Sequence, residues 1–143
     1  KMGYKSDSRE VIEYQKEVEE TITSYKKMKE AGIKILVGGD YGLDIAPHGT
    51  YAKDLEHYVN LFGFSNAEAL HSATSLGGEA MGNDGLLGTL EEGKLADLVI
   101  IDGNPLEDIT VLQNHKNIKA VMKDGLIYQG LTNKKNPYLN ENL

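Results

Sequence analysis

The feature that most constrains this chain is a short apolar run that ends in two glycines and an aspartate. The run from Ile33 to Val37 reads I-K-I-L-V, and its length and β-branched content are typical of a buried strand. Gly38 and Gly39 end the run, and Asp40 follows immediately. An α/β protein presents charged groups in this way at the carboxyl edge of its sheet. The stretch therefore predicts a buried strand with Asp40 just beyond its end.

A long helix is predicted directly before this strand. Ser6, Asp7 and Ser8 offer N-cap side chains, and the segment from Glu10 to Glu30 contains neither proline nor glycine. Gly32 supplies the stop, because glycine adopts a left-handed C-cap conformation at little cost. Helix, tight turn and buried strand together make half of a repeating α/β unit. Apolar residues recur at spacings of three and four along one helix face: Val11, Tyr14, Val18, Ile22, Tyr25 and Met28.

Three shorter helices are predicted after a loop that runs from Tyr41 to Thr50. The first covers Tyr51 to Phe62, and the second covers Ala67 to Thr74. The third begins at Thr74 or Ser75 and continues to Met81. The sequence S-N-A-E that begins at Ser65 has the spacing of a capping box, which favours a helix start there.

Strands are predicted in the second part of the chain, from Asn83 onward. Gly88 to Leu90 reads as a short strand, and Asp97 to Asp102 reads as a strand buried on both faces. Ile118 to Lys123 and Leu126 to Gln129 flank the dipeptide Asp124-Gly125, which is the strongest short-range signal for a β-hairpin. The chain therefore combines an α/β part with a small β part that has too few strands to be stable alone.

Composition excludes several classes of partner and site. The net charge is −7 over 143 residues, which argues against nucleic acid or an anionic membrane as a partner. The absence of cysteine excludes disulfides and thiolate metal sites. No apolar run approaches the roughly 20 residues that cross a bilayer. The amino end, K-M-G-Y-K-S-D-S, has no apolar signal region, and we expect the chain to begin partway through a longer protein. The compartment stays open, with the cytoplasm as our expectation.

Local motifs do not complete an active site. The four histidines form neither an H-x-H pair nor an H-E-x-x-H motif, and G-G-D-Y-G does not have dinucleotide-binding spacing. Asp40 has two interpretations. It is either a turn residue that bonds its own backbone, or a metal-ligating carboxylate that takes a proton from an activated water. His48, between Pro47 and Gly49, is either a surface or structural loop residue or a substrate contact, and Tyr41 is either an ordinary core or surface tyrosine or a residue that lines a pocket. The residues alone leave these alternatives open.

Five stretches, taken in chain order, resemble the amidohydrolase superfamily. The nearest likeness is to its imidazolonepropionase-like and prolidase-like members, and it covers nearly all of residues 29–128. The stretches are G-I-K-I-L-V-G-G-D-Y-G, P-H-G, N-A-E-A-L-H-S-A-T-S-L-G-G-E-A-M-G, G-T-L-E-E-G-K-L-A-D-L-V-I-I-D-G-N-P-L and I-K-A-V-M-K-D-G. The order of these stretches makes the resemblance specific.

The resemblance implies an α/β fold: the carboxyl-terminal part of a (β/α)8 TIM barrel with part of a small β-sandwich. Residues 1–82 would be the last part of the barrel. Residues 83–130 would be the carboxyl-terminal half of a composite sandwich, whose other strands come from the amino end of the polypeptide. Residues 131–143 would be a polar tail.

The resemblance also implies a chemistry. Members of the family hold one or two divalent metals, most commonly zinc, and hydrolyse C–N bonds of amides, peptide-like compounds or cyclic amides with a metal-activated water. Asp40 falls on the family position that ligates metal and acts as general base. Tyr41 and His48 would contact a small-molecule or peptide-like substrate. Homo-oligomers are common in the family, so we expect one here.

The chain departs from the family pattern because it lacks the H-x-H, the bridging lysine or glutamate and the two further histidines. One carboxylate cannot hold a catalytic zinc, which needs three protein ligands. We therefore expect the remaining ligands on an upstream part of the same polypeptide, without which this portion would be inactive. The alternatives are a non-catalytic structural or interaction member of the fold, or an inactive fragment.

Overall fold

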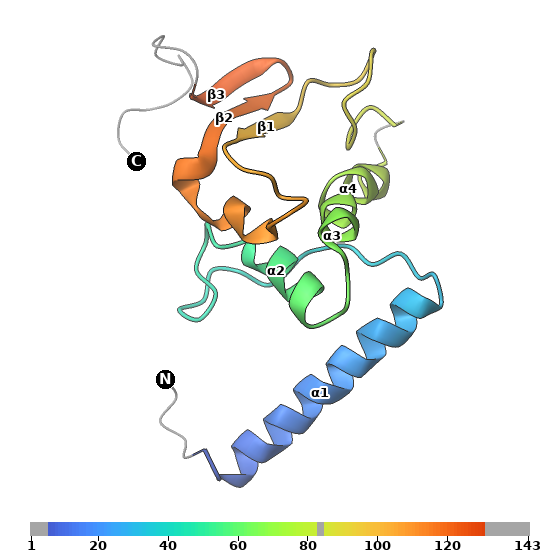
Figure 1. Cartoon of the computed structure of the whole chain (residues 1–143), viewed down its shortest axis with the longest axis vertical. Coiled ribbons are helices and arrows are strands. Elements are labelled where there is room, and N and C mark those ends of the chain that lie inside the picture. The colour runs from blue at the N-terminus through green and yellow to red at the C-terminus, as the bar shows by residue number, and fades with distance from the viewer. Residues whose placement is uncertain (1–5, 83–84, 131–143) are drawn as a thin grey trace.

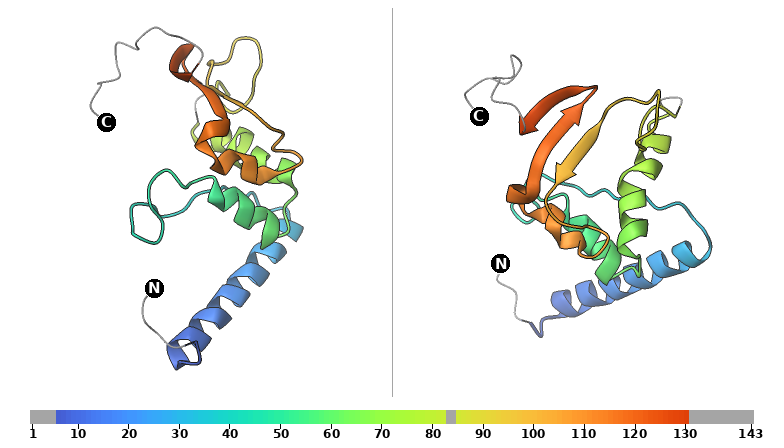
Figure 2. Two further views of the ribbon diagram at one scale, coloured as in Figure 1. Left: turned by 60° about the vertical axis from the view of Figure 1, so that its left-hand side comes forward. Right: turned by 45° about the horizontal axis from the view of Figure 1, so that its top comes forward.

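The computed structural model describes residues 6–82 and 85–130, and the predicted polar tail at 131–143 lies outside these described residues. Within them the chain is a mixed α/β structure with four α-helices, two short 3-10 helices and one three-stranded sheet. Figures 1 and 2 show α2, α3 and α4 lying between the long helix α1 and the sheet. No helix in this part of the chain is long and apolar enough to cross a membrane.

Helix α1 (Arg9–Glu30) confirms the predicted long helix. Ser8 caps its start by accepting a hydrogen bond from the Val11 N–H at 3.4 Å. At its end, the N–H groups of Gly32 and Ile33 bond the carbonyls of Lys29 and Met28, the pattern of a Schellman motif. The φ of +72° at Gly32 is the left-handed conformation that this motif requires.

The apolar face of α1 packs only near its carboxyl end. There the Tyr25 ring stacks on Phe62, with centroids 4.2 Å apart, and meets Tyr58 edge-on at 6.2 Å. Nearer the amino end, Ile12 and Tyr14 are 56% and 67% exposed. The periodicity therefore predicted the helix correctly, but two residues of its predicted apolar stripe, Tyr14 and Val18, are exposed.

The predicted buried strand at 33–37 is wrong. The segment belongs to no strand, and Ile33 and Leu36 are 54% and 44% exposed. Its backbone bonds side chains of the following helices instead. The Tyr58 hydroxyl donates to the Leu36 carbonyl at 2.6 Å, and Ser72 Oγ accepts from the Val37 N–H at 3.0 Å. A parallel strand needs neighbouring strands, and none of the described residues pairs with this segment.

Helices α2 (Lys53–Asn60), α3 (Asn66–Ala73) and α4 (Ser75–Ala80) confirm the three predicted short helices; α2 and α4 are shorter than predicted, and α3 begins and ends one residue earlier. The predicted capping box begins α3: the Glu68 N–H donates to Ser65 Oγ at 3.2 Å, and the Ser65 N–H donates to Glu68 Oε2 at 2.7 Å. The core of this part is formed by four buried residues: Leu55, Tyr58, Ala69 and Ile109.

The sheet is antiparallel in the order β1 (Leu98–Ile101), β2 (Ile118–Lys123), β3 (Leu126–Gly130). The predicted hairpin is confirmed, and Asp124 and Gly125 both have positive φ, 48° and 74°, as its two-residue turn requires. Two details of the prediction are wrong. No strand forms at 88–90, and β1 is not buried on both faces because its two central residues, Val99 and Ile100, are exposed.

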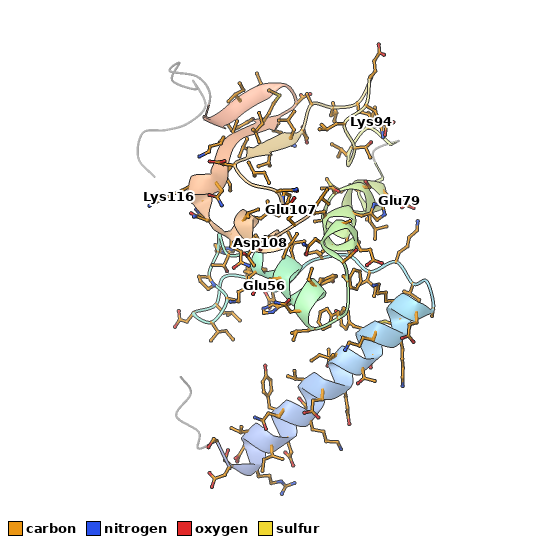
Figure 3. All side chains as sticks on the ribbon, in the orientation of Figure 1. Glu56, Glu79, Lys94, Glu107, Asp108 and Lys116 are labelled. Carbon is orange, nitrogen blue, oxygen red and sulfur yellow. The ribbon has the colours of Figure 1, made fainter. Side chains whose placement is uncertain are left out.

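Two 3-10 helices that the sequence did not predict join the sheet to the helices. They are η1 (Ile109–Gln113) and η2 (His115–Asn117), capped by the side chains of Asp108 and Asn114. Ile109 enters the core with the residues of α2 and α3. The side chain of Gln113 donates a hydrogen bond of 2.8 Å to Glu56 on α2, which Figure 3 labels beside Asp108. Helix η1, which precedes β2, is therefore tied to α2.

Candidate functional site

Asp40 follows the extended segment that rests on α2 and α3, which takes the place of the predicted buried strand. Its side chain is exposed, and it makes no hydrogen bond or ion pair with any residue in the ranges 6–82 and 85–130. A turn aspartate that bonds its own backbone would show such a contact. The carboxylate of Asp40 is therefore exposed, and it does not stabilise its own turn.

Gly39 brings the backbone before Asp40 into close approach with two side chains. A Cβ at this position would lie 3.0 Å from Asp54 Oδ2 and 3.0 Å from a ring carbon of Tyr41. Both separations are tighter than ordinary van der Waals contact. By contrast, a Cβ at Gly38 would meet nothing within 4 Å. A Cβ at the second of the two positions would therefore require Asp54, from α2, or the Tyr41 ring to move by a few tenths of an ångström.

Tyr41 is held from two sides. Its hydroxyl donates a hydrogen bond to the Asp54 carboxylate, and its ring meets Tyr51 edge-on with centroids 4.5 Å apart. Burial, and then the hydrogen bond to Asp54 and its negative charge, raise the pKa of Tyr41 to about 12. Tyr41 is therefore neutral near pH 7, and its hydroxyl acts as a donor.

His48 closes the other side of the loop. Its Nδ1 lies 2.7 Å from the Tyr51 hydroxyl, and its Nε2 would lie 2.9 Å from a Cβ on Gly42. Gly42 has a φ of +107°, and its N–H bonds the Ala46 carbonyl at 2.9 Å. The loop thus folds back so that the His48 ring covers Gly42, two residues after Asp40.

The structure brings Tyr41 and His48, both predicted from the sequence, into one group with two residues that the prediction missed. We call Tyr41, His48, Tyr51 and Asp54 the Tyr41 cluster. Asp54 lies in the first turn of α2, and Tyr51 lies in the turn that leads into it. The Y-x-x-D spacing at a helix start was the available signal, but it is also common where an acidic residue faces a helix dipole.

The other histidines do not join this group. His57 and His71 lie on α2 and α3, and His115 Nε2 lies 3.2 Å from the Gly49 carbonyl. No group of three or more His, Asp or Glu side chains that could hold a metal ion occurs among the described residues. Asp40 is a hard oxygen donor that fits a divalent metal, but it offers one ligand where a catalytic zinc needs three from protein. Asp40 alone therefore does not complete such a site within the described residues.

The sequence and the structure of the chain are similar to those of known proteins. A sequence model described as the amidohydrolase family matches residues 5–127. The chain is 36% identical over 108 residues to the ochratoxinase of Aspergillus niger, which covers 75% of this chain and 22% of that enzyme. It is 30% identical over 102 residues to the imidazolonepropionase of Syntrophobacter fumaroxidans, with 68% and 22% covered.

Solved structures show the same likeness. The crystal structure of A. niger ochratoxinase superposes with a TM-score of 0.69 at 34% identity, covering 77% of this chain and 25% of that one. A Xaa-Pro dipeptidase with methionine bound in its active site gives a TM-score of 0.68 at 39% identity, with 76% and 25% covered. The chain therefore spans about a quarter of the length of the relatives it matches.

Proposed function

Because the chain belongs to the amidohydrolase family, we propose that it is the carboxyl-terminal portion of a metal-dependent hydrolase that cleaves C–N bonds. The observation that carries the proposal is the free carboxylate of Asp40, presented at the end of an extended segment in a chain with this family relationship. The remaining ligands would come from an upstream part of the same polypeptide. In the full protein, α2, α3 and α4 would close a (β/α)8 barrel, and the sheet would complete a small β-sandwich.

Asp40 would be both a metal ligand and the general base. When bound, a divalent metal, with zinc as our choice and one or two ions per site, would lower the pKa of the attacking water. Asp40 accepts a proton as the water oxygen attacks the carbonyl carbon of the substrate. Asp40 then returns this proton to the leaving nitrogen as the C–N bond breaks, so that the products are a carboxylic acid and an amine.

The substrate class follows from the relatives. Ochratoxinase, imidazolonepropionase and Xaa-Pro dipeptidase are the names of proteins that resemble this chain. They support an amide, a peptide-like compound or a cyclic amide as the substrate. Tyr41 and His48 flank the backbone of Asp40, and we assign their rings to the wall of the substrate pocket. A homo-oligomer is part of the proposal, as it is common in this family.

The test uses the full-length protein and a panel of Xaa-Pro dipeptides, N-acyl amino acids and cyclic amides, with release of the amine as the measurement. Asp40→Asn should lower kcat by roughly 10²- to 10⁴-fold, because an amide cannot accept the proton. Asp44→Asn removes an exposed loop carboxylate four residues away and serves as the matched control. The melting temperature of each variant shows whether the fold is retained.

Two results would contradict the proposal. Retained turnover in Asp40→Asn would exclude Asp40 as the base. A wild-type protein that binds no divalent metal and cleaves nothing in the panel would instead support a non-catalytic member of the fold.

A further inference from the structure

We propose that Asp54 is a positioning residue that holds the Asp40 carboxylate in its working place through the hydroxyl of Tyr41. The proposal rests on the function proposed for Asp40. It adds a residue on a different element, 14 positions later in the chain.

The Asp54 carboxylate lies beside Gly39, which precedes Asp40, and interacts with the side chain of Tyr41, which follows it. Before Asp40, its Oδ2 occupies the space that a Cβ on Gly39 would need, at 3.0 Å. After Asp40, it accepts the hydrogen bond of the Tyr41 hydroxyl. Because the Asp40 side chain itself bonds no residue in the described ranges, these two neighbours hold the backbone from which its carboxylate extends.

Helix α2, which carries Asp54, is held in place by buried residues. The next residue, Leu55, is 7% exposed, and Tyr58, one turn later, is 5% exposed. Tyr58 also donates a hydrogen bond of 2.6 Å to the Leu36 carbonyl, so α2 holds the segment before the glycines as well. A site group that is supported by side chains on a packed helix is held more closely than one on a free loop.

The Tyr41 ring has little freedom to leave this position. Tyr51 meets it edge-on at 4.5 Å, and the Tyr51 hydroxyl is in turn 2.7 Å from His48 Nδ1. The Tyr41 cluster therefore closes around the turn, with Asp54 at one end and His48 over Gly42 at the other.

This support matters because proton transfer needs a heavy-atom separation of about 2.6–3.2 Å. A displacement of about 1 Å in such a group can cost 10²-fold in rate. Residues that orient a metal ligand without touching the metal typically affect metal affinity or activity by about 10- to 100-fold.

A purely structural role for Asp54 is the alternative explanation. It lies in the first turn of α2, where a negative charge favours the helix dipole. That role would appear in the melting temperature and would not depend on Tyr41. Glu56, in the same turn, provides the matched control: it accepts hydrogen bonds from Gln113 and Asn60 and belongs to no part of the Tyr41 cluster.

The experiment compares Asp54→Asn, Tyr41→Phe, their double variant and Glu56→Gln in the full-length protein. The measurements are kcat and KM on an Xaa-Pro dipeptide or another panel compound that the wild type cleaves. The rate at which a chelator removes the divalent metal and the melting temperature complete the set. We expect Asp54→Asn and Tyr41→Phe each to lower kcat by roughly 10- to 100-fold with KM changed less than twofold, and to speed metal loss. Glu56→Gln should match the wild type in kcat, KM and the rate of metal loss, whatever its melting temperature.

The double variant decides whether the two residues act as a unit. If Asp54 acts through the Tyr41 hydroxyl, the double variant should be no slower than the slower single variant. Effects that multiply, or an Asp54→Asn protein that behaves like Glu56→Gln in both kcat and metal loss, would overturn the positioning role. The proposed function fails separately, through an active Asp40→Asn. If Asp40→Asn is inactive and Asp54→Asn is normal, only the positioning role fails.

Discussion

The hydroxyl of Ser72 on α3 bonds the extended segment twice: it donates to the Ile35 carbonyl at 2.6 Å and accepts from the Val37 N–H at 3.0 Å. Ser72 is 2% exposed, so these bonds are made away from water. One serine thus satisfies backbone groups that a neighbouring strand would otherwise satisfy. Ser72 therefore holds the backbone of the segment three residues before Asp40.

We therefore predict that Ser72→Ala destabilises the fold. Removing the hydroxyl leaves a partly buried donor and a partly buried acceptor without their partner, which costs about 1–3 kcal/mol. The free energy of unfolding, measured with urea, checks this expectation. Ser24→Ala is the control, because Ser24 is exposed on α1 and bonds only the Glu20 carbonyl of its own helix. Equal effects of the two substitutions would show that the contacts of Ser72 with the segment are unimportant.

The two glycines before Asp40 should respond differently to alanine. Gly39→Ala forces Asp54 or the Tyr41 ring to move by a few tenths of an ångström, whereas Gly38→Ala meets open space. With Asp40 as the proposed general base, Gly39→Ala should lower kcat of the full-length protein by on the order of tenfold, while Gly38→Ala stays near the wild type. Steady-state kinetics on the same substrate measure both. A larger loss in Gly38→Ala would contradict the assigned contacts.

The capping box of α3 predicts a pH dependence of stability. Hydrogen bonds from the Ser65 backbone, from Lys29 and from the Ser65 hydroxyl lower the pKa of Glu68 from 4.5 to about 2. A carboxyl group with a lowered folded-state pKa stabilises the fold above its unfolded pKa. This contribution is lost as the pH falls from about 4.5 to about 2.

Glu68→Gln should therefore flatten the stability profile over this pH window, as measured by the melting temperature at each pH. Because the side chain is 48% exposed and its ion pair with Lys29 is screened by solvent, we expect an effect of no more than about 1 kcal/mol. Glu79→Gln, which removes a more exposed carboxylate paired with Lys34, is the control. A profile that is unchanged by Glu68→Gln would exclude Glu68 as its source.

The turn between β2 and β3 should be sensitive to a single methyl group. Gly125 has a φ of +74°, which an alanine adopts at a cost of about 1–2 kcal/mol. Gly125→Ala should lower the free energy of unfolding by about this amount. Gly77→Ala is the opposite case, since Gly77 lies inside α4, where its Cβ would meet only the Ser72 carbonyl at 3.8 Å. That variant should be neutral or slightly more stable, by up to about 1 kcal/mol.

Local chemistry explains which parts of the fold could be predicted from the sequence. The N-cap at Ser8, the capping box at Ser65 and the Asp124-Gly125 turn each depend on residues within a few positions, and all three are present. The strand predicted at 33–37 depended on partners distant in the chain, and in the described residues helix side chains take their place. Apolar content alone could not distinguish these two environments.

The candidate site divides in the same way. The position of Asp40 after two glycines was visible in the sequence, and so were Tyr41 and His48 beside it. Asp54 was not, because only the docking of α2 against the turn brings its carboxylate to Gly39 and Tyr41. An acidic residue in a first helical turn has an ordinary explanation, and nothing local separates the two cases.

Asp54 and Tyr58 are one helical turn apart on α2, so the two attachments that flank the glycines share one face of one rigid body. A small tilt or slide of α2 would carry both attachments together and move the segment and Asp40 as a unit, without bending the turn between them. Leu55 lies between Asp54 and Tyr58 in the sequence and belongs to the core. Substitutions around Leu55 would therefore shift the position of the Asp40 carboxylate by small amounts. Core substitutions could therefore change the position of the proposed general base while every residue that contacts the substrate stays the same.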